Sequence, residues 1–374
     1  MVAPDGAYGG PIRVATNVSA ELVRQGHDVA AVAGYRGVKS ARDLDHVFGK
    51  VPHRLFRSIN VLPGSGFAGS FALGLLLWIL KNARAYDVVH VHFARDLTVL
   101  PATLILRLLR VPHVLQTHGM IDPSSRRSAR VLDWIATRRL VRGAPILSLT
   151  PQEDADLRAV AGEKLEIHRV INGIPSGWRD AASEASSSGT EQATTVGFLA
   201  RLHARKRPVA FVRMALELGR EFPDVTFLLR GPDEGELPSI KAELRAAQEP
   251  PNVCLLGPVA PGDVVRALGE LDIFVLPSVD EPFPMSVLEA LALGKPVVVT
   301  DTCGLAPFIR DAKAGIVVGD SQSDLTEGVR ALLRDADLRG AMGGSAVRLI
   351  DSVFAIEAVI EDVLHAYSSA STGR

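Results

Sequence analysis

The feature that most constrains the fold is an alternation between short apolar runs rich in valine and isoleucine and longer segments with helical spacing. In the first half of the chain these runs lie at residues 29–33, 87–93, 114–117 and 146–150. Such runs are typical of buried strands in a parallel sheet. The helical segments between them include residues 11–25, 97–110 and 126–141. Strand and helix in alternation predict right-handed βαβ units.

The alternation stops and then starts again, which predicts two domains. Residues 183–195 are crowded with Ser, Gly, Thr and Ala, a composition typical of an interdomain linker. Strand-like runs then recur at residues 195–199, 225–229, 253–256, 273–276, 297–300 and 316–318. A chain of 374 residues is long enough for two cores. We expect two Rossmann-like, doubly wound α/β domains facing an interdomain cleft. The expected limits are 1–175 for the first domain, 176–193 for the linker and 194–349 for the second domain.

Composition excludes several classes of function. Lys and Arg number 41 against 42 Asp and Glu, so the net charge of −1 provides no overall attraction for nucleic acid. Cys254 and Cys303 are the only cysteines, which argues against a disulfide framework or a zinc site. The apolar stretch 71–80 is too short to span a bilayer and predicts a buried helix. No basic segment followed by an apolar run marks a signal peptide, so a cytoplasmic protein is expected. Little room precedes Pro4 for a first strand, which suggests a truncated start.

Ligands of doubly wound folds bind at the carboxyl ends of the strands, and a basic turn follows the strand expected at 195–199. This turn contains Arg201, Arg205, Lys206 and Arg207, and a helix is expected from about Pro208. Cations beside a helix amino terminus suit a diphosphate. The alternative is a solvated basic turn without a ligand.

A second group of polar residues follows the strand expected at 273–276. Glu281 lies on a loop, and Glu289 falls near the start of a helix expected from about Met285. Carboxylates accept paired hydrogen bonds from hydroxyl groups, as recognition of a sugar or ribose requires. Compensation of the helix dipole is an alternative role for Glu289, but it does not explain the loop.

The first domain offers a third group. Gly9 and Gly10 are expected to precede a helix, where glycine lets the backbone approach a ligand closely. His118 ends a strand and is a candidate hydroxyl partner, although a lone histidine is more often structural. His90 and His92 alternate with valines on one strand, and we interpret them as groups that position the site or satisfy local polar atoms.

Together these motifs resemble the retaining glycosyltransferases of family 4, also called group 1, which have the GT-B fold. The segment from Glu281 to Glu289 is similar to the family's Glu-x7-Glu motif, and residues 197–206 resemble its Arg/Lys phosphate site. The surroundings are also similar, namely Gly9 with Gly10, Asn172 with Gly173, Gly231 with Pro232, and Pro282, Phe283, Leu288, Ala290, Gly294 and Pro296. Each short match is weak, but the combination is specific.

The resemblance implies a role for each site residue. Arg201 and Lys206 would hold the donor diphosphate, Glu289 the ribose, and Glu281 and His118 the transferred sugar. Donor contacts would also come from Gly9, Gly10, Phe283, Met285 and Ser286. Pro284 departs from the family's frequent glycine and has no N–H to donate, so Met285 and Ser286 must supply any backbone donors.

The resemblance further implies retaining transfer from a UDP- or GDP-sugar to a glycan, a lipid-linked acceptor or a small molecule. No metal or other cofactor is expected, because cations of the chain supply the positive charge at the phosphates. A final helix at 350–369 would pack back on the first domain. Replacing Arg201 or Lys206 by alanine should weaken catalysis and leave the fold intact.

Other functions remain open at this point. A sugar-nucleotide epimerase of the same fold, or a non-catalytic sugar-nucleotide-binding protein, would use the same diphosphate site. Gly64, Gly66 and Gly69 form a dinucleotide-like string, but it is not in a first βα turn. The Asp-x-Asp pairs, Asp43 with Asp45 and Asp154 with Asp156, are interpreted as surface acids rather than a metal site.

One expected helix is strongly basic. Arg126, Arg127, Arg130, Arg138, Arg139 and Arg142 surround the single acid Asp133. The Arg126–Arg142 region could therefore contact an anionic membrane surface at the inner face of the membrane. The arginines do not share one narrow face, so a solvated basic helix is the alternative.

Overall fold

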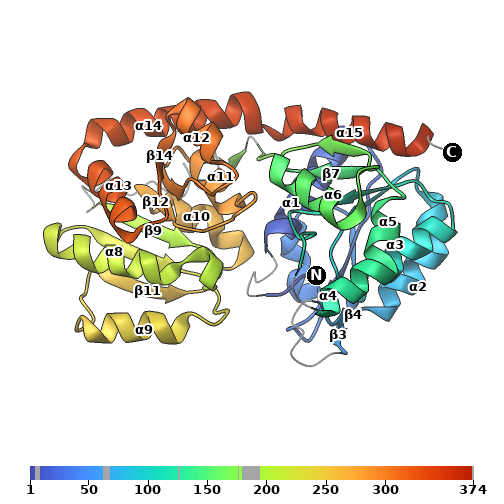
Figure 1. Cartoon of the computed structure of the whole chain (residues 1–374), viewed down its shortest axis with the longest axis horizontal. Coiled ribbons are helices and arrows are strands. Elements are labelled where there is room, and N and C mark those ends of the chain that lie inside the picture. The colour runs from blue at the N-terminus through green and yellow to red at the C-terminus, as the bar shows by residue number, and fades with distance from the viewer. Residues whose placement is uncertain (5–8, 62–67, 125–126, 176, 179–193, 373–374) are drawn as a thin grey trace. The chain divides into compact units, whose positions relative to one another are not determined.

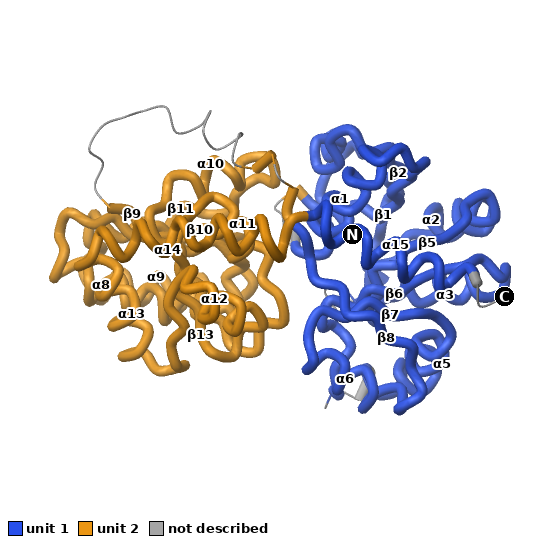
Figure 2. Tube along the Cα trace, turned by 90° about the horizontal axis from the view of Figure 1, so that it is seen from above, with its two compact units in different colours: residues 1–3, 8–173, 356–374 blue, residues 4–7, 174–355 orange. Residues whose placement is uncertain are grey.

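The computed structural model describes residues 1–4, 9–61, 68–124, 127–175, 177–178 and 194–372, and it divides into two compact units (Figure 2). Unit 1 comprises residues 1–3, 8–173 and 356–374, and unit 2 comprises residues 4–7 and 174–355. Apart from positions 177 and 178, the linker expected at 176–193 lies outside the described residues. Residues 350–355 belong to unit 2, so the terminal part of unit 1 begins at Ile356.

Unit 1 contains a parallel sheet with the order β5-β6-β7-β8. These strands are β5 (Val89–His92), β6 (His113–Gln116), β7 (Ile146–Ser148) and β8 (Ile167–Arg169). Strand β1 (Ala31–Tyr35) pairs in parallel with β2 (His53–Arg57), and β3 (Ile59–Asn60) pairs antiparallel with β4 (Ser70–Phe71). The helices are α1 (Gly9–Arg24), α2 (Leu73–Asn82), α3 (Val99–Leu108), α4 (Arg127–Leu132), α5 (Arg138–Val141), α6 (Pro151–Ala161) and α15 (Ile356–Thr372) (Figure 1).

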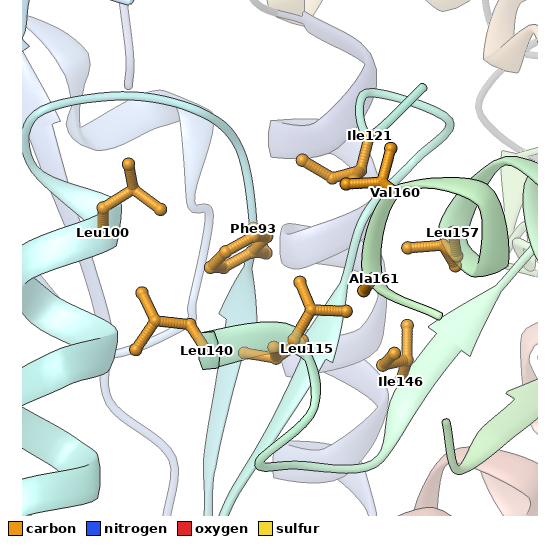
Figure 3. Close-up of a cluster of buried hydrophobic side chains, with 10 residues drawn as sticks. Phe93, Leu100, Leu115, Ile121, Leu140, Ile146, Leu157, Val160 and Ala161 are labelled. Carbon is orange, nitrogen blue, oxygen red and sulfur yellow. The ribbon is translucent and has the colours of Figure 1, made fainter. Parts of the chain in front are cut away.

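Alternation along β5 explains how the unit 1 sheet is covered. Val89, Val91 and Phe93 point into clusters that include residues of α2 and α3, and Phe93 is fully buried beside Leu100 and Leu115 (Figure 3). The intervening His90 and His92 therefore point to the opposite face, because successive side chains of a strand alternate. His90 meets Tyr367 of α15 there, and α15 also packs on β6 and α1. Helix α15 therefore covers the face of β5 on which His90 and His92 lie.

Unit 2 is a six-stranded parallel sheet with the order β11-β10-β9-β12-β13-β14. Its strands are β9 (Thr195–Leu199), β10 (Thr226–Arg230), β11 (Val253–Gly257), β12 (Ile273–Leu276), β13 (Val297–Thr300) and β14 (Gly315–Val318). Its α-helices are α8 (Pro208–Glu221), α9 (Leu237–Ala246), α10 (Val264–Gly269), α11 (Met285–Ala292), α12 (Ala306–Ala312), α13 (Gln322–Arg334) and α14 (Ala336–Leu349). The strand order reverses between β9 and β12, which makes their carboxyl ends the switch point where such folds bind ligands.

Comparison with the sequence predictions shows where local pattern is sufficient. The strands expected at 195–199, 273–276 and 297–300 have those limits in the structure. The short strands β2, β3, β4 and β8 were not predicted, since they are brief and partly exposed and lack a long apolar run. The helix expected at 71–80 is present as α2, but it is buried on one face only: Leu75, Leu76 and Ile79 are buried, whereas Leu73, Leu77 and Leu80 are exposed.

Candidate active site

The basic turn after β9 is shaped by the segment that follows β10. The backbone N–H of Ala200 donates to Arg230 O (3.2 Å), and that of Leu202 donates to Pro232 O (2.8 Å). Gly231 makes this approach possible, because a Cβ there would lie 1.8 Å from the carbonyl oxygen of Ala200. The absence of a side chain at Gly231 thus determines the path of the backbone that carries Arg201.

The two cations of this turn have different surroundings. Arg201 donates to the Glu234 carboxylate (2.7 Å), and its side chain is 39% exposed. Lys206 ends a short 3₁₀ turn (Ala204–Lys206), is only 9% exposed and forms an ion pair with Glu281. Burial lowers the pKa of Lys206, and the neighbouring Glu281 carboxylate opposes that shift. Lys206 therefore depends on its partner for its charge.

The loop that carries Glu281 is held from two sides. The Val279 N–H donates to Arg205 O (3.0 Å), which ties this loop to the basic turn. On the other side, the Gly304 N–H donates to Glu281 O (2.8 Å), and the Asp280 N–H donates to Thr302 Oγ1 (3.2 Å). Asp280 has a left-handed backbone (φ 49°), so the turn is sharp. These contacts hold the Glu281 side chain, which is 7% exposed, against Lys206.

Helix α11 begins at Met285, as the sequence predicts, and Pro284 at its N-cap provides no side-chain hydrogen bond. The first N–H groups of a helix have no intrahelical acceptor, so this helix end suits an anion or a sugar oxygen. Glu289 lies just past the first turn and is 4% exposed. Phe283 and Met285 are buried, and the Phe283 ring contacts Phe354 edge-on with centroids 6.0 Å apart. Ser286 is half-buried.

Three histidines of unit 1 form a stack: His90 and His92 lie on β5, and His118 follows the carboxyl end of β6. His90 and His92 stack with ring centroids 4.7 Å apart, and His92 and His118 stack at 5.0 Å. His92 Nδ1 and His118 Nε2 share a hydrogen bond (2.7 Å), and His90 Nδ1 bonds the Tyr367 hydroxyl (2.9 Å). Burial lowers the pKa of His90 to about 4 and lowers the pKa values of His92 and His118 below their ordinary range. The imidazoles are therefore neutral at pH 7 and act as hydrogen-bonding groups.

Glu153 is a site-supporting residue that the sequence predictions missed. Its side chain is 2% exposed and accepts hydrogen bonds from Thr117 Oγ1 (2.5 Å), Gly119 N (2.6 Å) and Leu149 N (2.7 Å). Thr117 and Gly119 flank His118, whose backbone is left-handed (φ 51°). The sequence signal is a Thr-x-x-Glu capping pattern starting at Thr150. In the structure the carboxylate of that pattern turns to the His118 loop.

Two expectations about the other residues need correction or restatement. Gly9 and Gly10 do not precede a helix, because they are its first two residues; the helical spacing of the residues after Pro11 hides this earlier start. The Asp-x-Asp pairs have structural contacts: Asp43 caps a 3₁₀ helix, Asp45 bonds His53, and Asp154 bonds Arg169. Among the residues that the structure describes, no group of three or more His, Cys, Asp or Glu could hold a metal.

Two family models match nearly the whole chain. Residues 9–173 match "Glycosyl transferase 4-like domain", and residues 181–348 match "Glycosyl transferases group 1". The chain belongs to the group 1 (family 4) glycosyltransferases. It is therefore an enzyme that uses a nucleotide-sugar donor. The dinucleotide-like string at Gly64, Gly66 and Gly69 falls within the matched transferase domain, and residues 62–67 lie outside the described part of the chain.

Curated relatives and solved structures agree with this assignment. An alpha-D-kanosaminyltransferase of Streptomyces kanamyceticus is 26% identical over 81% of this chain and 83% of its own length. A D-inositol 3-phosphate glycosyltransferase of Corynebacterium jeikeium is 28% identical over 73% of this chain and 70% of its own. Anabaena HepE, solved with UDP and glucose, superposes with a TM-score of 0.76 at 16% identity and covers 97% of both chains. At that identity the superposition shows the GT-B fold.

Proposed function

We propose that the enzyme transfers a sugar from UDP or GDP, with Arg201 and Lys206 binding the diphosphate. The observation that carries this proposal is the position of the Lys206–Glu281 pair at the switch point between β9 and β12. A half-exposed arginine and a buried, preorganised lysine supply positive charge where the leaving diphosphate develops negative charge. The N-terminus of α11 adds the backbone N–H groups of Met285 and Ser286.

The carboxylates divide the recognition of the donor's hydroxyl groups. Glu281 bonds Lys206 through Oε2, and a carboxylate has further acceptor positions that can receive a sugar hydroxyl. Glu289, buried in α11, would receive the ribose hydroxyls. Phe283, two residues before α11, is buried and contacts the Phe354 ring, which anchors the chain leading into this helix.

Unit 1 would contribute to the same reaction through His118 and the start of α1. A neutral His118, held by His92 and by the Glu153-anchored loop, can exchange one hydrogen bond with a hydroxyl of the transferred sugar. Gly9 and Gly10 open a 16-residue helix that has no acidic residue in its first turn, which suits an anionic donor group.

The mechanism that fits these contacts is retention by front-face attack. Double displacement requires Glu281 to attack the anomeric carbon, but an ion pair with a buried ammonium group makes this carboxylate a weaker nucleophile. In front-face attack the departing phosphate accepts the proton of the acceptor hydroxyl, so the reaction needs no nucleophile from the enzyme. The acceptor class is a glycan, a lipid-linked molecule or a small molecule. Relatives are named for transfer of kanosamine and for action on inositol 3-phosphate.

A donor screen tests this function. Thermal shift and donor hydrolysis should select one UDP- or GDP-sugar, and chelator should leave turnover nearly unchanged, because the cations of the chain fill the charge role of a metal. NMR of the product should show the donor's anomeric configuration, and intact mass should show no covalent sugar on Glu281. Loss of activity in chelator that is restored by magnesium or manganese, or an inverted product, would contradict the proposed chemistry.

A further inference from the structure

The outer surface of α2, α3 and the α4–α5 segment in unit 1 is apolar to an unusual degree. Helix α3 packs against both α2 and α5 (Figure 1). Among the described residues, eleven large hydrophobic side chains are exposed, and eight of them lie on these helices with 47–73% exposure. They are Leu73, Leu77, Leu80, Leu104, Leu108, Val131, Trp134 and Ile135. A soluble monomer rarely leaves apolar side chains gathered in this way without a partner.

These helices are amphipathic, with one side exposed and apolar and the other side buried in unit 1. Leu73, Leu77 and Leu80 follow each other by four and three residues, so they form one stripe on α2. The opposite side of α2 buries Leu75, Leu76 and Ile79 against α3. The α4–α5 segment likewise buries Leu140 and exposes Trp134, near a π-helical turn (Asp133–Thr137). The exposed apolar side chains therefore take no part in the core of unit 1.

The same helices are strongly cationic. Within residues 73–85, 99–110 and 127–142 the sequence has nine Arg and Lys residues and a single acid. That acid, Asp133, is buried and accepts hydrogen bonds from Arg95, so it does not face solvent. The whole chain has a net charge of −1. The positive charge is thus concentrated on the same helical segments that expose leucine and tryptophan.

We propose that this surface docks on an anionic lipid bilayer. Leucines and a tryptophan enter the boundary between headgroups and acyl chains, and the flanking arginines and lysines bind acidic headgroups. No described helix is long and apolar enough to cross a membrane, so contact would be peripheral. The surface extends beyond the basic helix at 126–142 that the sequence indicated, since α2 and α3 supply all five of its exposed leucines. None of its residues belongs to the proposed donor site.

Flotation of the full chain with phosphatidylcholine vesicles, with and without phosphatidylglycerol, tests the proposal. The protein should float only with the anionic vesicles. Arg130→Gln with Arg138→Gln should weaken binding by about fivefold for each cation removed, or about 1 kcal/mol each. Leu77→Gln with Leu104→Gln should also weaken it. The matched controls are Arg266→Gln and Leu256→Gln, which change exposed residues of unit 2.

Tryptophan fluorescence gives a second, local measurement. Trp134 is 69% exposed, whereas Trp178 is buried and Trp78 is half-buried. Anionic vesicles should shift the emission to the blue, and Trp134→Phe should abolish that shift. Equal flotation of the helix variants and their controls, or absence of flotation, would overturn the proposal. So would light scattering showing that these leucines hold two copies together. Donor hydrolysis without vesicles tests the proposed function separately.

Discussion

Replacing Lys206 by methionine should destabilise the enzyme as well as inactivate it, in contrast to replacing Arg201 by alanine. Sequence reasoning expects both changes to leave the fold intact, but burial alters that expectation for Lys206. Its removal leaves the Glu281 carboxylate, 7% exposed, without its cation. Breaking a buried pair in this way costs about 3–5 kcal/mol. Arg201 pairs at a half-exposed position, where loss of an ion pair costs about 0–1 kcal/mol.

The difference should be visible in the melting temperature of unit 2. For a unit of this size, which spans residues 174–355, 1 kcal/mol corresponds to about 2–4 °C. Lys206→Met should therefore lower Tm by about 6–20 °C, and Arg201→Ala by no more than about 4 °C. Both should lower kcat/KM by an amount that corresponds to about 2–4 kcal/mol of lost transition-state stabilisation, since each removes a cation aimed at the leaving phosphate.

A double-variant cycle separates the pair from the two side chains. Combining Lys206→Met with Glu281→Gln removes both charges and should recover most of the lost stability while activity stays low. Calorimetry gives Tm, and initial rates at several donor concentrations give kcat/KM. If Lys206→Met melts with the wild type, or if the two single effects add in the double variant, the buried pair does not hold this loop and the reasoning is refuted.

Three further predictions concern other parts of the molecule. Glu153→Gln should lose about 1.5–3 kcal/mol of stability and lower kcat, because it releases the His118 loop. The control Glu163→Gln changes an exposed glutamate and should match the wild type. If both variants have a similar kcat, Glu153 does not position His118. Gly231→Ala should weaken UDP binding, because its Cβ would lie 1.8 Å from Ala200 O. Gly262→Ala, which has open space around it, should not weaken binding. Calorimetric titration measures both affinities, and equal affinities would contradict the prediction. Because burial lowers the pKa of His90 to about 4, the unfolded chain binds more protons below pH 6.5, so stability should fall as pH falls from 6.5 towards 4, by up to about 1.4 kcal/mol per pH unit for this histidine. Urea unfolding at several pH values should show a shallower slope in His90→Phe, and an unchanged slope would mean that His90 is not the group that titrates.

Local sequence pattern was sufficient for the elements that bury a continuous apolar run. The strands at 195–199, 273–276 and 297–300 and the start of α11 at Met285 follow from runs of Val, Ile and Leu and from Pro284 at the helix boundary. Family membership also followed from the sequence, since the Glu281 and Glu289 spacing and the Arg201–Lys206 turn are short-range patterns. Edge strands such as β8 escaped because a short, half-polar segment is a strand only where a neighbour pairs with it.

Only the tertiary structure decided how these residues interact. Glu281 and Lys206 are 75 positions apart, and they meet because the strand order places β12 beside β9. Glu153 reaches the His118 loop because β7 lies beside β6, and His90 meets Tyr367 because the C-terminal helix α15 packs on β6 and α1. The apolar stretch 71–80 shows the same limit from the other side. Its composition predicts burial, but α2 has a core on one face only, and the leucines on its other face remain exposed.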